Sequence, residues 1–175
     1  MEQQAVTSGI IGAVADIIKV EEKYETAIET ALGGSIQNIV TDTQKTAKKM
    51  IEYLKKNRYG RVTFLPLDAV KGKEFARKEI LLEPGVIGAA NQLVIYDEVY
   101  KDLFASLLGQ ILVVKDMDAG IKIANKYHHS VRIVTLDGDS LNRGGAMSGG
   151  AFKNKSNLLG RSREVEELKK KLDRW

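Results

Sequence analysis

The sequence predicts an α/β protein in which helices and strands are mixed, with two related subdomains and a terminal stub of coiled-coil helix. Three observations predict this fold class: a helical stripe that occurs twice, a strand rich in β-branched residues after each copy, and a narrow apolar seam at the end of the chain. The chain has 175 residues, of which 43% are hydrophobic, so it can bury a sizeable core. We therefore expect a folded globular unit.

The two stripes have the spacing of an apolar helix face, with residues at i, i+3, i+4, i+7 and i+8. Each stripe ends at a glycine, Gly33 or Gly109, which suits the left-handed cap at the end of a helix. Two similar helices are thus expected at equivalent places. Their apolar residues are Tyr24, Ala27, Ile28, Ala31 and Leu32, and then Tyr100, Leu103, Phe104, Leu107 and Leu108.

Each stripe leads into a strand, a second helix and a closing strand. Asp42 and Asp116 have side chains suited to the start of the second helices. In this interpretation an arginine opens both closing strands. We interpret the two units as a degenerate structural duplication. The expected strands are 36–41, 61–65, 111–115 and 132–136, within units 12–68 and 92–139.

Segment boundaries follow from turn residues and from the final helix. Pro84-Gly85 marks a turn between the units. The final helix carries the seam of a coiled coil, formed by Val165, Leu168, Leu172 and Trp175. We expect coiled-coil ends at 1–8 and 161–175, a first subdomain at 9–83 and a second at 84–160. The domain would then be an insertion between two arms.

Composition narrows the possible classes of protein. The absence of cysteine excludes disulfides and thiolate metal sites. No apolar run approaches the roughly 20 residues that cross a bilayer, and the first residues lack a targeting pattern. We expect a cytoplasmic protein with no membrane partner.

The net charge of +4 is divided unevenly along the chain. Residues 45–78 hold eleven basic residues against three acidic ones, and residues 153–175 hold eight against four. Solvated helix faces and a polyanion-binding surface both remain open as explanations. By charge alone, one candidate nucleic-acid surface consists of Lys48, Lys49, Lys55, Lys56 and Arg58.

No catalytic or cofactor motif emerges from the sequence. The glycine-rich stretch 144–150 lacks the Gly-Lys-Ser/Thr of a phosphate loop, because Ala151 and Phe152 follow the last glycine. It also lacks a nucleophile elbow, since Gly145 precedes Ser148 by three residues. His128 and His129 are adjacent, which favours a turn over a pair of metal ligands. We expect no enzyme activity, metal or cofactor in this chain.

Clustered glycines favour backbone with positive φ or the close approach of a second backbone. At Gly144, Gly145, Gly149 and Gly150, the second backbone could belong to another copy of the chain. A flexible loop is the alternative, and the residues alone do not separate the two.

Several short motifs, in order, resemble the hinge of a bacterial SMC protein, a chromosome-organising ATPase. The resemblance covers nearly the whole chain. Its motifs are Glu22-Lys23-Tyr24-Glu25, Ala31-Leu32-Gly33-Gly34, Leu136-Asp137-Gly138-Asp139, the glycine stretch 144–150 and Leu158-Leu159-Gly160-Arg161-Ser162-Arg163-Glu164.

The resemblance implies a two-subdomain hinge, inserted in a long antiparallel coiled coil, that forms a twofold homodimer. It places Gly144, Gly145, Gly149 and Gly150 at the dimer contact. Arg143 departs from the proline often found before the glycine pair, which leaves the local turn geometry open. ATP binding would belong to head domains outside this sequence, and non-SMC subunits would bind elsewhere on the full protein.

The resemblance also implies accessory DNA binding near the coil, with a preference for single strands. Phosphate contacts by lysine and arginine would make this binding sensitive to salt and independent of sequence. Because few aromatic residues are available to stack on bases, we expect the binding to be weak. The matching residues are Lys153, Lys155, Arg161 and Arg163. We therefore expect a nucleoid-associated homodimerisation hinge that acts in chromosome condensation and segregation. The alternatives are a module that primarily binds nucleic acid and a small enzyme with a cleft between the subdomains.

Overall fold

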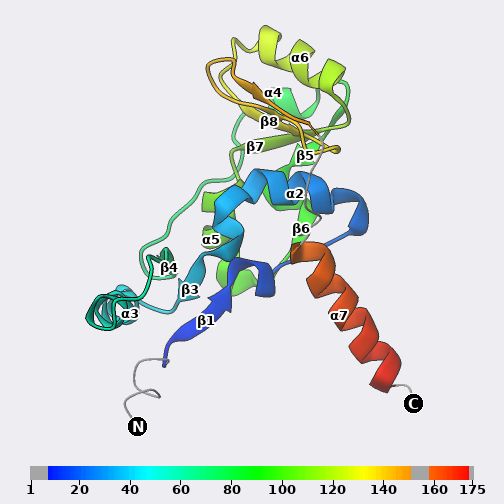
Figure 1. Ribbon diagram of the computed structural model, residues 1–175. Helices are drawn as coiled ribbons and strands as arrows, with labels where there is room; N and C mark the ends of the chain where they lie inside the picture. Colours follow the sequence, from blue (N-terminus) through cyan, green and yellow to red (C-terminus); the bar gives the residue numbers. More distant parts are fainter. Residues whose placement is uncertain (1–7, 151–157, 174–175) are drawn as a thin grey trace.

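The computed structural model describes residues 8–150 and 158–173. Helices and strands are mixed, as the sequence predicts, and the element order of the first half is repeated in the second (Figure 1). The first half contains β1 (Ile10–Ala13), β2 (Lys19–Val20), α2 (Glu25–Leu32), β3 (Ile39–Thr41), α3 (Gln44–Lys56) and β4 (Phe64–Pro66). After α4 (Lys78–Leu81), the second half contains β5 (Val86–Ala89), β6 (Val94–Ile95), α5 (Lys101–Leu108), β7 (Ile111–Val114), α6 (Met117–Lys126) and β8 (Arg132–Thr135).

Strand pairing confirms the internal duplication. β1 is antiparallel to β3 and β3 parallel to β4; in the same way β5 is antiparallel to β7 and β7 parallel to β8. β2 and β6 pair with each other, and Lys19 stands opposite its own counterpart, Ile95. The two halves are therefore related by an approximate twofold axis through this short ladder.

A repeated tripeptide begins each half and was missed in the sequence. Ile11-Gly12-Ala13 and Ile87-Gly88-Ala89 each contain a β-bulge, with the glycine φ at 147° and 158°. The Asp16 carboxylate accepts a hydrogen bond from the Ala13 amide at 3.2 Å, and Gln92 Oε1 accepts one from the Ala89 amide at 3.3 Å. The second unit therefore begins at Val86 rather than at residue 92.

The expected alignment of the closing strands was wrong by two residues. Phe64 pairs with Ile39, and Ile133 pairs with Leu112, which occupies the same place in the second half. Thr63, rather than Arg61, is therefore the counterpart of Arg132. The first strand after α2 also starts late, at Ile39, because residues Gly33–Gln37 form a 3-10 helix.

The second half extends its sheet with a hairpin, β9 (Ser140–Leu141) and β10 (Met147–Ser148). The result is a five-stranded sheet in the order β10-β9-β8-β7-β5, against three strands in the order β1-β3-β4. One hydrophobic core spans both halves, with Val14 and Val40 from the first and Phe104 and Val134 from the second. The division of the chain near residue 84 therefore stays a prediction.

α7 (Leu158–Asp173) projects from the body, and α2 lies between its root and the five-stranded sheet (Figure 1). Leu159 belongs to the shared core, whereas Val165 and Leu168 of the expected seam are 49% and 58% exposed. These two seam residues therefore do not pack on the domain. Within the described ranges, no helix is both long and apolar enough to cross a membrane.

Candidate dimer interface and basic surfaces

In the glycine-rich stretch, Gly144 and Gly145 lie in the turn of the β9–β10 hairpin, whereas Gly149 and Gly150 follow β10. The Asn142 amide donates to the Ala146 carbonyl at 2.8 Å, and the Gly145 amide donates to the Asn142 carbonyl at 3.1 Å. The Gly144 amide donates to the carbonyl of His129 at 3.0 Å. These bonds give the turn a defined geometry, with Arg143 directly before the glycine pair.

A positive φ explains why glycine occupies three of these four positions. Gly144, Gly145 and Gly150 have φ of 87°, 106° and 132°, a region that L side chains rarely adopt. Among the described residues, a Cβ added at Gly144 or Gly150 would meet nothing within 4 Å. Within that part of the chain, space for a second backbone is therefore present beside both glycines.

Gly149 differs, because its φ lies outside the positive range. A Cβ at this position would come within 2.5 Å of Asp139 Oδ1. The Asp139 side chain thus leaves no room for a Cβ at position 149.

Among the described strands, β1 and β5 are edge strands in both halves, whereas the opposite edges of the two sheets, β4 and β10, differ. β10 is the outer strand of the five-stranded sheet, and Met147 on it is 54% exposed. β4 pairs with β3 on one side, and no other described strand pairs with its second side. The equivalent side of β8 is covered by β9. Unpaired edges of this kind are templates for pairing with another chain.

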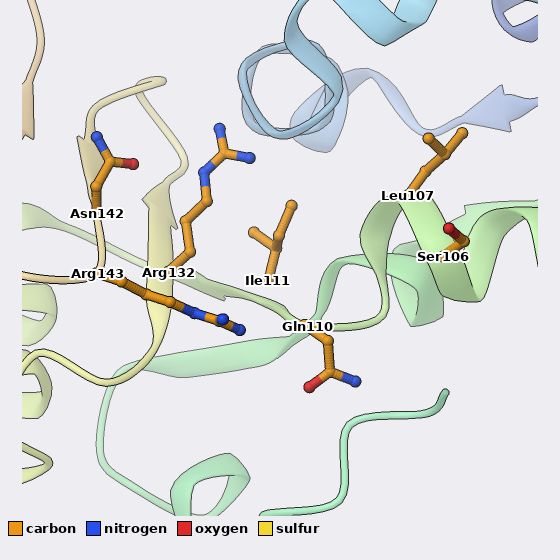
Figure 2. Close-up of a pocket in the computed structure, with 7 residues that line it drawn as sticks. All are labelled: Ser106, Leu107, Gln110, Ile111, Arg132, Asn142 and Arg143. Carbon is orange, nitrogen blue, oxygen red and sulfur yellow. The ribbon is translucent and has the colours of Figure 1, made fainter. Parts of the chain in front are cut away.

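A hollow of about 380 Å³ lies beside the glycine turn (Figure 2). Arg132 points toward α2, where its two terminal nitrogens donate to the carbonyls of Ala31 and Thr30 at 3.1 and 3.2 Å. Arg143 extends across the hollow toward Gln110 (Figure 2). The hollow is lined by Ser106, Leu107, Gln110, Ile111, Arg132, Asn142 and Arg143. This lining includes two arginines and no carboxylate, so it is positively charged.

The basic residues proposed near the coil are only partly described. Lys153 and Lys155 lie outside the described residues, as does the side chain of Arg161. Arg163 forms ion pairs with Glu25, with Glu167 at 3.1 Å and with Glu22 at 3.9 Å. The hydrogen bonds that Arg163 donates to Glu25 and Glu167 raise the pKa of its guanidinium. Arg163 therefore joins α7 to α2, and three carboxylates offset its charge.

Glu25 and Glu29 are site residues that the sequence reasoning missed. Glu25 is 3% exposed and pairs with Arg163, while Glu29 Oε1 accepts from the Leu159 amide at 3.1 Å, at the start of α7. Burial raises the pKa of Glu29. The available signal was weak, because carboxylates that alternate with an apolar stripe usually face solvent.

The second basic surface lies on α3. Lys48, Lys49, Lys55, Lys56 and Arg58 are all exposed. Among them, Lys48 pairs weakly with Glu52 at 3.9 Å. Arg58 has φ of 55° directly after α3, and His128 has φ of 57° at the same place after α6. The two histidines therefore lie in a helix-terminating turn, as expected.

Comparison with known proteins identifies the family. The sequence model described as "SMC proteins Flexible Hinge Domain" matches residues 7–124. The chain is 46% identical over 174 residues to the chromosome partition protein Smc of Desulfitobacterium hafniense, and 45% identical over 168 residues to that of Bacillus subtilis. These matches cover 98% and 94% of this chain but 14% of each relative.

Solved structures agree with the sequence matches. An asymmetric dimer of the Geobacillus stearothermophilus SMC hinge domain is similar with a TM-score of 0.88 and 44% identity, over 99% of this chain and 71% of that one. The Pyrococcus furiosus SMC hinge domain is similar with a TM-score of 0.72 and 33% identity, over 88% of this chain and 79% of that one. From its sequence and its fold alike, the chain belongs to the family of SMC flexible hinge domains.

Proposed function

We propose that this chain is a homodimerisation hinge that joins two coiled-coil arms in chromosome condensation and segregation. The proposal rests on one observation, which is that the sheets of the two halves differ at equivalent edges. The second half has a hairpin along β8, whereas the equivalent side of β4 is bare among the described residues. Each copy thus has an outer strand, β10, that the first half lacks, and a bare side of β4 whose equivalent in the second half is covered.

Two copies can satisfy both edges at once. β10 of one protomer would add to β4 of its partner, and the twofold axis would repeat the contact at the other side. The exposed glycines at both ends of β10 support this arrangement, since backbone without Cβ atoms permits close approach. The hinge domain of Geobacillus stearothermophilus, which is similar to this chain, forms an asymmetric dimer in its crystal structure.

Gly149 allows a test of the interface that is separate from folding of the turn. Asp139→Ala would remove the carboxylate that an added Cβ at Gly149 meets, leaving Asp139 Cβ at 3.7 Å. Gly149→Ala in this background should weaken dimerisation by about 1–3 kcal/mol, because the added methyl would overpack the contact. Dimer dissociation is measured by light scattering over a dilution series, against Asp139→Ala alone. Equal dimer affinity in the two variants would contradict the role of Gly149.

Accessory DNA binding is the second part of the proposal. Lysines and arginines near the coil would contact phosphates and release counterions, giving affinity that falls with salt. Lys153→Glu with Lys155→Glu should weaken DNA binding and leave the dimer intact. Lys101→Glu with Lys122→Glu is the charge-matched control on the second half. Tight binding at physiological salt by a monomer would instead favour a module that primarily binds nucleic acid.

The ATPase activity of the full protein is proposed to lie outside this chain. The chain spans 14% of the length of the two Smc relatives above, which leaves ample sequence for head domains elsewhere.

A further inference from the structure

The bare side of β4 ends at a proline. The Leu67 amide donates to the Thr41 carbonyl at 2.9 Å, so Leu67 points toward β3. Because the backbone groups of successive strand residues point to opposite edges, Phe64 and Pro66 point away from β3. Pro66 has no N–H, and its carbonyl already accepts from the two amides of the following turn, at 3.1 and 3.0 Å. On this side of β4, Phe64 can therefore form a complete backbone pair and Pro66 cannot.

The second half shows that the fold does not require this proline. Thr135 occupies the place of Pro66, since both pair with the last residue of the central strand. The Thr135 amide donates to the Asp139 carbonyl at 2.9 Å, directly before β9, which runs antiparallel to β8. A donor thus stands at this position where the edge is covered within the chain, and a proline stands there where it is not.

The outer side of β10 ends in a similar way. The Ala146 carbonyl accepts from the Asn142 amide at 2.8 Å, so Ala146 points toward β9. By alternation, Met147 and Gly149 point outward and carry both an N–H and a carbonyl. The Gly145 amide is already bonded to the Asn142 carbonyl at 3.1 Å. The ladder that β10 can offer to a second strand therefore stops at Gly145.

The two ends coincide in one antiparallel register. When Met147 stands opposite the partner's Phe64, Gly145 stands opposite the partner's Pro66, and a glycine leaves room for the proline ring. A shift by two residues would instead place Met147 opposite the partner's Pro66. The Met147 amide and carbonyl would then lose their partners, which is costly in an interface.

The apolar side chains favour the antiparallel direction. Leu65 packs against the shared core, so Phe64 and Val62 lie on the opposite face of β4. Val62 is 41% exposed and Met147 is 54% exposed. Antiparallel pairing brings Met147 onto the face of the partner's Phe64 and Val62. Parallel pairing would place Ser148 opposite Phe64 and turn Met147 to the other face.

We propose that Pro66 sets the register in which two copies of this chain pair. β10 adds antiparallel to the partner's β4, with Met147 opposite the partner's Phe64. Pro66 acts as a positioning residue, because it denies a complete pair to a strand that is shifted by two residues. This inference rests on the proposed dimer contact and adds its direction and its register.

Engineered disulfides test the register. The chain contains no cysteine, so a new pair has no background. In the proposed register, Thr63 and the partner's Ser148 form a non-hydrogen-bonded pair with Cα atoms about 4.5 Å apart, which suits a disulfide. Thr63→Cys/Ser148→Cys should therefore form a covalent dimer with oxidised glutathione, as seen on a denaturing gel without reductant.

Two matched pairs lie two residues out of register, where the Cα atoms are about 7–8 Å apart. Leu65→Cys/Ser148→Cys and Thr63→Cys/Ala146→Cys should both stay largely monomeric on the same gel. The second of these pairs replaces exposed residues and so spares the core. Equal cross-linking of the matched pairs and the Thr63→Cys/Ser148→Cys pair, or preferential cross-linking of either matched pair, would overturn the proposed register.

Replacement of the proline tests its role. Pro66→Thr supplies the N–H that the second half has at this place, and it should raise cross-linking of Leu65→Cys/Ser148→Cys by about twofold to tenfold. Pro84→Thr changes the other proline of the chain, in the turn between the halves, and should leave cross-linking unchanged. An equal yield in the Pro66→Thr and Pro84→Thr backgrounds would show that Pro66 does not set the register.

Light scattering on the cysteine-free chain separates this inference from the function on which it rests. A monomer would contradict the homodimerisation hinge itself. A dimer in which Thr63→Cys/Ser148→Cys fails to cross-link would contradict the register alone. Circular dichroism of each variant confirms that the compared proteins are folded.

Discussion

The two halves of the hinge have the same order of elements. The second half, however, buries more residues of the helix that follows its central strand. α6 buries Ala119, Gly120, Ile123 and Ala124, whereas α3 buries Ala47. The sheet beside α6 has five strands and that beside α3 has three. The first half therefore leaves more of its helix exposed, and among the described strands it leaves uncovered the side of β4 whose equivalent on β8 is paired. The difference explains why the proposed contact joins β10 of the second half to β4 of the partner's first half.

The largest expected effect concerns packing. Leu112→Ala removes a fully buried side chain from β7 and should lower the free energy of unfolding by about 2–5 kcal/mol. Leu54→Ala makes the same change on the half-buried face of α3 and should cost less than half as much. Both are measured by chemical denaturation at one protein concentration. Equal costs would show that the first half is as tightly packed as the second.

A smaller effect is expected where α2 differs from α5. Glu25 of α2 pairs with Arg163, whereas α5 has Lys101 at the matching position. Arg163→Gln should cost about 1.5–3 kcal/mol, because a buried carboxylate loses its charged partner. Faster hydrogen exchange in the first turns of α7 would localise the loss. The control Lys169→Gln, an exposed position on the same helix, should leave exchange unchanged.

The smallest effect is a dependence on pH. Burial raises the pKa of Glu29, so its contribution to stability is present below the ordinary carboxyl range and is lost as pH rises through the raised value. Ala105, the counterpart on α5, has no such charge. Glu29→Gln keeps an acceptor for the Leu159 amide and should gain stability relative to the wild type as pH rises. Denaturation between about pH 3 and 7 measures the difference, and a constant offset would contradict it.

Local patterns predicted the helices and the duplication, but they did not predict which distant residues meet. The apolar stripes of α2 and α5 follow from spacing of three and four residues, and the glycine stretch follows from composition. The pair of Glu25 and Arg163 joins residues 138 positions apart, and no local signal in either segment specifies the other. β5 was missed because Val86–Ala89 is short and contains a glycine at its bulge.

The conformation of the glycine turn is fixed within the chain, because its hydrogen bonds are local or involve the neighbouring His129 turn. Its role in pairing depends on a second molecule and therefore stays a prediction. The lysines of α3 were chosen from charge alone, and their exposure became visible only in the fold.

The bonds at the two ends of α2 have a mechanical consequence. Its first turn is attached to α7 through Glu25, and its last carbonyls accept from Arg132 on β8, two strands from β10. Tension that enters along α7 would load this eight-residue helix before reaching the hairpin. The short helix thus gives a pulling force a direct route from α7 to the sheet whose outer strand is proposed to contact the partner.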